Sequence, residues 1–129
     1  MLKLPKKIVG SQGEKIARSY IKKQGMKILE ENYRAIKGEI DIIANDGECI
    51  VFIEVKTNTR MSEFPPEIRV NRAKQEQIGK IAQMYLMKTQ QTDAYCRFDI
   101  ISVILQPKNK NQPYEINHIK DAFWLQKVI

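Results

Sequence analysis

The order of apolar and polar residues predicts an α/β fold with the element order α-β-β-β-α-β. Two observations carry this prediction. Apolar residues recur at helical spacing in two separate stretches. Runs rich in Ile and Val, which are typical of strands, stand between those stretches and after the second one. At 129 residues the chain has room for one hydrophobic core, so we expect a single domain over residues 1–129.

The first helix is expected to begin at Ser11. The sequence Ser11-Gln12-Gly13-Glu14 has the form of a capping box, with Ser as the N-cap and Glu three residues later. Apolar residues follow at helical spacing, and Gly25 is expected to end the helix. In this interpretation the Glu14 carboxylate accepts a hydrogen bond from the Ser11 backbone, which needs no metal. A catalytic role is the alternative for the same side chain.

Turn residues and apolar spacing place the remaining elements. Asp46-Gly47 is typical of a two-residue hairpin turn, and Pro65-Pro66 closes a polar loop. We expect strands at 26–33, 38–45, 48–57 and 97–105, a second helix at 67–88, a short edge strand at 114–119, and a brief helix through Phe123 and Trp124.

The expected hairpin brings acidic side chains together. A turn at Asp46-Gly47 places Asp41 opposite Phe52 and Glu39 opposite Glu54. Because side chains alternate along a strand, Asp41 and Glu54 then share a face as diagonal neighbours, roughly 5 to 8 Å apart. The other face is expected to carry only apolar side chains, namely Ile40, Ile42, Ala44, Val51, Ile53 and Val55. Both faces are therefore largely apolar, as in a sheet that helices cover on both sides.

Carboxylates in such a setting predict a metal site. Removing a charge from water costs several kcal/mol unless it is paired or bound to metal, and Mg²⁺ or Mn²⁺ prefers oxygen ligands. Lys56 brings an ammonium to the same place, where it could stabilise a phosphate or orient a water. Asp41, twelve further residues and then Glu54-Val55-Lys56 have the form of the D-(x)n-(D/E)-x-K nuclease motif. Glu39 is either a further ligand or a solvated residue at the start of its strand.

The chain also resembles the YraN-type family of bacterial proteins over nearly its whole length. Tyr33 departs from that resemblance, because the family is expected to have Trp there, and this difference should affect packing more than chemistry. The resemblance is carried by Gly13-Glu14, Asn32-Tyr33-Arg34, Gly38-Glu39-Ile40-Asp41, Phe52-Ile53-Glu54-Val55-Lys56-Thr57, Lys74, Arg97-Phe98-Asp99 and His118-Ile119-Lys120-Asp121-Ala122-Phe123.

That family is similar to the archaeal Holliday-junction resolvases of the restriction-endonuclease-like superfamily. The resemblance implies a restriction-endonuclease-like core, with a central mixed sheet flanked by helices. It also implies that Glu14, Asp41, Glu54 and Lys56 occupy the catalytic positions, with the three acids as metal ligands.

The basic composition favours an anionic partner. The net charge is +7 and the isoelectric point is near 9.4. Lys74 either contacts phosphate or packs its stem against apolar neighbours with its ammonium in water. Four arginines are expected to contact the DNA backbone, or else to form a solvated basic surface: Arg34, Arg60, Arg69 and Arg72. His118 is expected to be structural, and Asp99 to pair locally, for example with Arg97.

Several classes of protein are not indicated. Cys49 and Cys96 belong to no Cys/His cluster, so neither a zinc site nor a disulfide scaffold is expected. Residues 1–10 lack the pattern of a signal peptide, and no apolar run reaches the roughly 20 residues of a membrane helix. We therefore expect a cytoplasmic protein without a membrane partner.

The resulting hypothesis is a DNA endonuclease that requires Mg²⁺ or Mn²⁺ and acts on branched or other DNA. A resolvase-like enzyme must cut two strands, so a symmetric homodimer would supply two sites. Two alternatives stay open. One is a non-catalytic nucleic-acid-binding module of the same fold, and the other is a scaffold for a protein partner.

Overall fold

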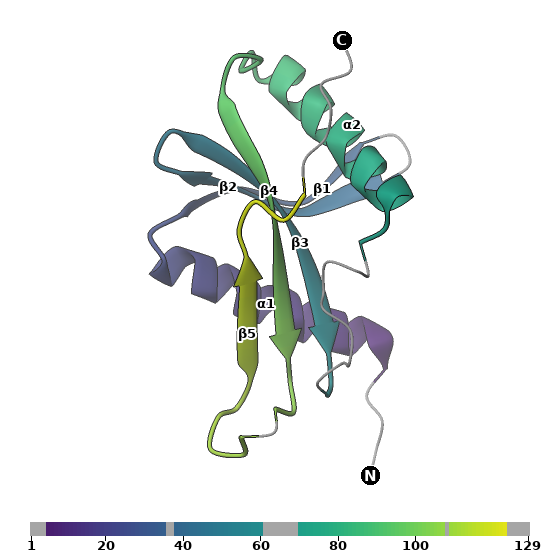
Figure 1. The fold of residues 1–129 in the computed structure, drawn as a ribbon, viewed down its shortest axis with the longest axis vertical. Helices are drawn as coiled ribbons and strands as arrows, with labels where there is room; N and C mark the ends of the chain where they lie inside the picture. The colour runs from purple at the N-terminus through teal and green to yellow at the C-terminus, as the bar shows by residue number, and fades with distance from the viewer. Residues whose placement is uncertain (1–4, 36–37, 61–69, 108, 124–129) are drawn as a thin grey trace.

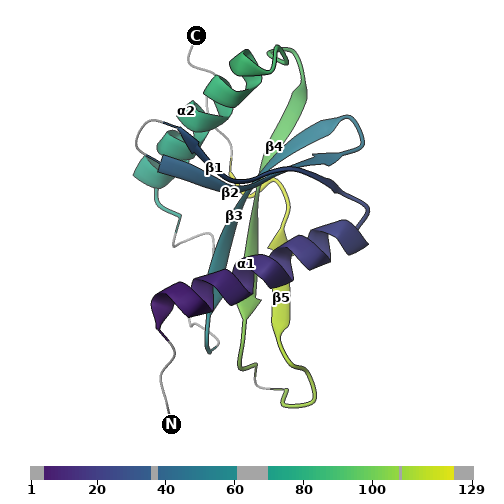
Figure 2. The same ribbon diagram turned by 180° about the vertical axis from the view of Figure 1, so that it is seen from behind.

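A mixed β-sheet lies between two helices in the computed structural model (Figures 1 and 2). The structure describes residues 5–35, 38–60, 70–107 and 109–123. The elements within these ranges are α1 (Lys6–Lys23), β1 (Lys27–Ala35), β2 (Gly38–Asp46), β3 (Cys49–Asn58), α2 (Arg72–Lys88), β4 (Tyr95–Ile104) and β5 (Glu115–Ile119). The first six follow the predicted order, and β5 is the expected edge strand.

The strands lie in the sheet in their order along the chain, from β1 to β5. Neighbours are antiparallel except β3 and β4, which are parallel and joined through α2. This mixed sheet confirms the predicted fold class, and its order fits a restriction-endonuclease-like core.

Each face of the sheet is covered by one helix (Figures 1 and 2). On one face, Ala17 and Ile21 of α1 pack with Ile42, Val51 and other residues of the sheet. On the opposite face, residues of α2 form a second cluster with the strands; its largest members include Ile43, Phe52, Ile78, Ile81 and Tyr85. The prediction of a sheet that is apolar on both faces is confirmed.

The predicted start of the first helix is wrong. Helix α1 begins at Lys6, and Pro5 occupies the N-cap position without a side-chain hydrogen bond. Its carbonyl oxygen accepts the backbone N–H groups of Ile8 and Val9. Ser11 and Glu14 therefore lie inside the helix and form no capping box. The predicted end is confirmed, since α1 stops at Lys23 and Gly25 follows with a φ of +88°.

The predicted hairpin register is also wrong, by two residues. Asp46 pairs with Cys49, so Gly47 and Glu48 make the turn, and Ile43 lies opposite Phe52. Asp46 is kept in the strand by Arg97 of β4, whose Nη2 is 2.9 Å from Asp46 Oδ2. A slip of two residues by itself leaves each side chain on its own face. Asp41 and Glu54 lie close together, since Asp41 Oδ2 accepts the backbone N–H of Val55, the residue after Glu54.

One side chain of the predicted apolar face lies elsewhere. Ile40 packs in the cluster of α2 together with Ile43, which is three positions later in the chain. Regular alternation would put them on opposite faces. The alternation is therefore broken between Ile40 and Ile43, in the segment that contains Asp41.

The ends of two further elements differ from the expected ones. Asn71 caps α2 by accepting the Lys74 backbone N–H at 2.9 Å, so the helix starts at Arg72, and positions 67–69 of the expected helix lie outside the described residues. Phe123 is a core residue but not helical, and Trp124 lies outside the described residues. Within the described chain, no helix is long and apolar enough to cross a membrane.

Candidate active site

The backbone pairing of β2 and β3 stops one residue short of the two predicted metal ligands. The last pair joins Ile42 and Ile53, directly before Asp41 and Glu54. Asp41 Oδ2 accepts the backbone N–H of Val55 at 2.8 Å. The carboxylate thus supplies an acceptor for a partly buried N–H where the pairing of β2 and β3 has ended. This bond fixes Asp41 against the strand that carries Glu54 and Lys56.

Glu54 lies between two ammonium groups. Strand β3 stays paired with β4 through this segment, with Glu54 opposite Ile100, and the Glu54 side chain is only 8% exposed. Its Oε1 is 3.5 Å from Lys56 Nζ and 3.8 Å from Lys74 Nζ. Lys74 comes from the first turn of α2, so residues far apart in the sequence meet here. The sequence predicted Lys74 as a phosphate contact, and the structure places it beside the predicted catalytic group.

Helix α1 approaches the same region through a glycine. A Cβ built on Gly13 would overlap Thr57 Oγ1 and would lie 2.5 Å from Thr57 Cγ2. Only glycine therefore allows α1 to lie this close to β3. Glu14 follows directly and is near enough to act electrostatically on Asp41 and Glu54. Sequence reasoning had noted Gly13 only as part of a motif; its contact with Thr57 depends on the tertiary fold.

The acids of this cluster oppose one another's ionisation. Burial first, and then the negative charge of Glu54, raise the pKa of Asp41 to about 7, while the Val55 N–H lowers it and Glu14 and Glu39 add further increases. Burial also raises the pKa of Glu14, with Glu39 as the next cause. The excess of negative charge is what a bound cation would relieve.

The donor set suits a hard divalent cation. Asp41, Glu54 and Glu14 offer only oxygen atoms, which Mg²⁺ and Mn²⁺ prefer, and Mg²⁺ commonly uses one or two carboxylates plus water and substrate phosphate. In the described ranges, no three His, Cys, Asp or Glu side chains by themselves form a group arranged to hold a metal. Asp41 and Glu54 supply carboxylates of the kind that such a site uses, and Glu14 acts on both electrostatically.

Two of the predicted DNA-binding arginines pair with acids other than Asp41, Glu54 and Glu14. Arg34 is 83% exposed and pairs with Glu39 at 3.1 Å, which also gives Glu39 a partner of its own. Arg72 is 86% exposed and pairs with Glu76 at 3.4 Å. Arg60 is exposed just beyond β3, and Arg69 lies outside the described residues.

A second polar network lies in the interior. Asp99 is fully buried and accepts hydrogen bonds from Arg97 Nε at 3.0 Å and from the Asp121 backbone N–H at 2.9 Å. His118 Nε2 is 2.8 Å from Asp99, and His118 Nδ1 is 3.0 Å from the Tyr20 hydroxyl. The predicted pairing of Asp99 with Arg97 is confirmed. Burial raises the pKa of Tyr20, the opposite of what activates a nucleophile, so this network supports structure.

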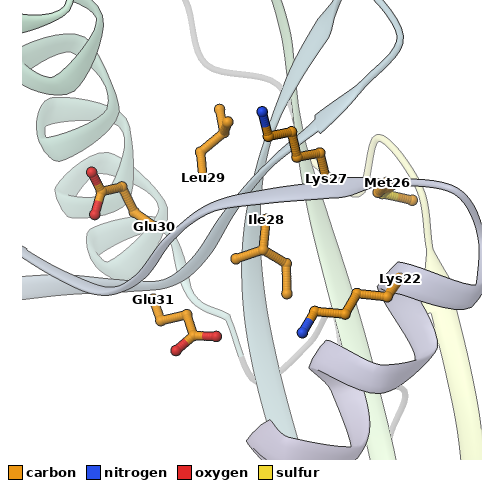
Figure 3. Close-up of a pocket in the computed structure, with 7 residues that line it drawn as sticks. All are labelled: Lys22, Met26, Lys27, Ile28, Leu29, Glu30 and Glu31. Atoms are coloured by element: carbon orange, nitrogen blue, oxygen red, sulfur yellow. The ribbon is translucent and has the colours of Figure 1, made fainter.

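A shallow pocket lies between the end of α1 and the edge strand β1 (Figure 3). Its lining residues are Lys22, Met26, Lys27, Ile28, Leu29, Glu30 and Glu31. None of the predicted catalytic residues belongs to this lining. The carboxylates and lysines described above, not this pocket, form the candidate active site.

A mixed sheet between two helices, with an Asp, a Glu and a Lys where two strands separate, defines an α/β protein of restriction-endonuclease-like architecture. Residues 13–103 match the profile of the Uncharacterised protein family UPF0102. The chain belongs to this family, the YraN-type family that its motifs resemble.

Curated relatives match over most of their length. A UPF0102 protein of Geobacter metallireducens is 45% identical over 124 residues, which cover 96% of this chain and 98% of the relative. A UPF0102 protein of Caldanaerobacter subterraneus is 47% identical, over 95% of this chain and 100% of the relative. One of Clostridium botulinum is 49% identical, over 91% of this chain and 94% of the relative. The chain therefore corresponds to nearly the whole of each relative.

Proposed function

We propose that this protein is a metal-dependent DNA endonuclease that hydrolyses phosphodiester bonds at the cluster of Asp41, Glu54, Lys56 and Glu14. The observation that carries the proposal is the meeting of two carboxylates, Glu54 nearly buried and Asp41 half-buried, with two ammonium groups where β2 and β3 separate. Acids crowded in this way destabilise an idle fold, and the lysines beside them match the charge of a phosphate.

The residues divide into an acidic and a basic half. Asp41 and Glu54 would hold Mg²⁺ or Mn²⁺, with Glu14 as support directly or through water. When bound, such a cation supplies Lewis-acid activation of water and of the phosphate. Asp41 is held in position by the Val55 N–H. Lys56 positions the attacking water or stabilises the charge of the reacting phosphate, and Lys74 anchors a neighbouring phosphate.

The substrate class proposed is DNA, including branched DNA, because the similarity to resolvases suggests it. Cutting two strands of a junction requires two sites, which a symmetric homodimer would supply. The proposed location of this activity is the cytoplasm.

A cleavage assay tests the proposal. Labelled four-way junction, flap, duplex and single-stranded DNA are incubated with the protein and Mg²⁺ or Mn²⁺. We expect metal-dependent cutting of at least one substrate, and a loss of roughly a hundredfold or more in Asp41→Ala and in Lys56→Ala. Glu48→Ala and Lys80→Ala change exposed residues of the same types outside the cluster and should cut normally.

Two results would contradict the endonuclease. If the wild type cuts nothing but binds DNA in a salt-sensitive way that persists in Asp41→Ala, the protein is a non-catalytic nucleic-acid-binding module. If it neither cuts nor binds DNA at physiological salt, a scaffold for a protein partner remains.

A further inference from the structure

Helix α1 carries positive charge far in excess of its acids. Its 18 residues include the cations Lys6, Lys7, Lys15, Arg18, Lys22 and Lys23. Glu14 is the only acid in the helix, and it belongs to the candidate active site. None of these cations was among the DNA contacts that the sequence predicted.

Three of the lysines lie along one side of the helix. Because successive residues of an α-helix turn by about 100°, Lys7, Lys15 and Lys22 fall within a sector of about 80°. All three are exposed, and none pairs with an acid in the described part of the chain. We call these three residues the α1 row. Arg18 lies in the same sector, but its Nε is 3.4 Å from Glu31 Oε1, so we leave it out of the row.

The α1 row borders the candidate active site. Around the helix, Glu14 lies between the α1 row and the buried side that Ala17 and Ile21 form. Glu14 is turned by about 20° from Lys7. Along the helix it lies between Lys7 and Lys15. At the other end, Lys22 reaches the pocket beside β1, where it points toward the side of the strand that carries Ile28 and Glu31 (Figure 3). An anionic chain that follows the row therefore passes Glu14.

Helix stability does not explain the row. Lysines in a last turn interact favourably with the helix dipole, which accounts for Lys22 and Lys23. Lys6 and Lys7 stand in the first turn, where the dipole favours acids, and that turn has none. Lys7 therefore opposes the local preference of the helix, as expected of a residue retained for binding.

The geometry points to the sugar–phosphate backbone of a nucleic acid as the partner of the α1 row; this inference rests on the proposed function and extends it. From Lys7 to Lys22 the row spans roughly 22 Å, which corresponds to about six or seven phosphates of one duplex strand. An anionic membrane is the less suitable partner. Basic helices bind membranes with an apolar face, but Ala17 and Ile21 of α1 are fully buried against the sheet.

Two triple variants with equal charge test the inference. In the row variant Lys7, Lys15 and Lys22 are changed to Gln. In the control variant Lys80, Lys88 and Lys110, which are exposed on α2 and in the β4–β5 loop, are changed to Gln. Gln keeps a high helix propensity, and circular dichroism verifies the fold. Binding to a labelled 30-base-pair duplex is followed by fluorescence anisotropy in EDTA across a range of KCl concentrations.

We expect the row variant to lose affinity by roughly tenfold or more at low salt. The negative slope of log affinity against log salt concentration should become shallower by about 2.7, for three lost phosphate contacts. In the control variant this slope should change by less than about 1. Equal changes in both variants would overturn the inference. So would row-dependent binding to phosphatidylserine vesicles with DNA binding unaltered, or no DNA binding by the wild type.

The test separates this inference from the proposed function because it is run without metal. If the wild type cuts DNA but the row variant binds like the control, the α1 row is wrong and the endonuclease stands. If row-dependent binding is seen with a wild type that never cuts, the row stands and the endonuclease is overturned.

Discussion

At the scale of single residues, Asp41 and Asp99 are both largely withdrawn from solvent, but their neighbours differ in charge. Asp99 has Arg97, His118 and a backbone N–H as partners, and these outweigh burial and lower its pKa. Asp41 has one backbone N–H and faces other acids, so its pKa is raised. The first arrangement stabilises a fold, whereas the second is expected where a charged ligand completes a site.

The difference gives a prediction for Asp99→Asn. The substitution keeps the size of the side chain but removes one of the two carboxylates that Arg97 faces and leaves Asp46, so the free energy of unfolding at pH 7 should fall by about 1.5 to 3 kcal/mol. Urea denaturation measures this change. Asp93→Asn, at an exposed acid, is the control and should be nearly neutral.

The hydrogen bonds of Asp99 also make the free energy of unfolding depend on pH. Because the pKa of Asp99 is lower in the folded protein than its ordinary 3.8, its contribution is complete above about pH 4 and is lost as the pH falls through the folded-state value. Asp99→Asn should therefore lose less stability than the wild type between pH 4 and pH 2. If both proteins lose the same free energy of unfolding between pH 4 and pH 2, other carboxylates cause the loss.

At the scale of elements, the contact of α1 with β3 depends on the absence of a side chain. In Gly13→Ala the new methyl group would overlap side-chain atoms of Thr57, so α1 must shift. The free energy of unfolding should therefore fall by about 1 to 3 kcal/mol. Gly10→Ala, one turn earlier in the same helix, meets nothing within 4 Å. It should raise stability, by up to about 1 kcal/mol, because alanine favours a helix.

Thermal unfolding of the two variants measures this contrast. Adding Thr57→Ala to Gly13→Ala removes the two closest atoms of the contact and should restore part of the lost stability. If both glycine substitutions raise the melting temperature alike, α1 does not lie as close to β3 as the structure places it.

The elements also show what local sequence can predict. Apolar spacing placed all the described helices and strands, because burial on a sheet face or a helix stripe dictates it. One error arose from a contact between distant residues, and another from a helix start nearer the N-terminus. Asp46-Gly47 has the composition of a tight turn, but Arg97 of β4 holds Asp46 in the strand. Ser11 and Glu14 have the spacing of a capping box, but Pro5 starts the helix.

The candidate site was predictable for a different reason. Asp41, Glu54 and Lys56 could be predicted as neighbours because a two-residue error in register leaves the same two strand segments side by side. The face of Asp41 could not be predicted, because the alternation is broken between Ile40 and Ile43. The second ammonium beside Glu54, from Lys74, could not be positioned because it comes from a helix whose packing is set by the whole sheet. The Val55 N–H that holds Asp41 was missed because it depends on where the ladder ends.

At the scale of the whole molecule, a chain of positive net charge contains a small acidic centre. The net charge of +7 draws phosphate-rich partners, while Asp41, Glu54 and Glu14 would repel a phosphate that came without a cation. The positive net charge and the acidic centre are compatible if a divalent cation accompanies the substrate. These carboxylates are therefore expected to bind such an ion, whichever DNA is the substrate.

Titration with manganese tests whether these carboxylates bind a divalent ion. Titration of the metal-free protein with Mn²⁺, followed by electron paramagnetic resonance, should show saturable binding that is lost in Asp41→Asn and in Glu54→Gln. Glu48→Gln, at an exposed acid of the same hairpin, should bind as the wild type does. No saturable binding by the wild type, or equal binding by all four folded proteins, would contradict the account.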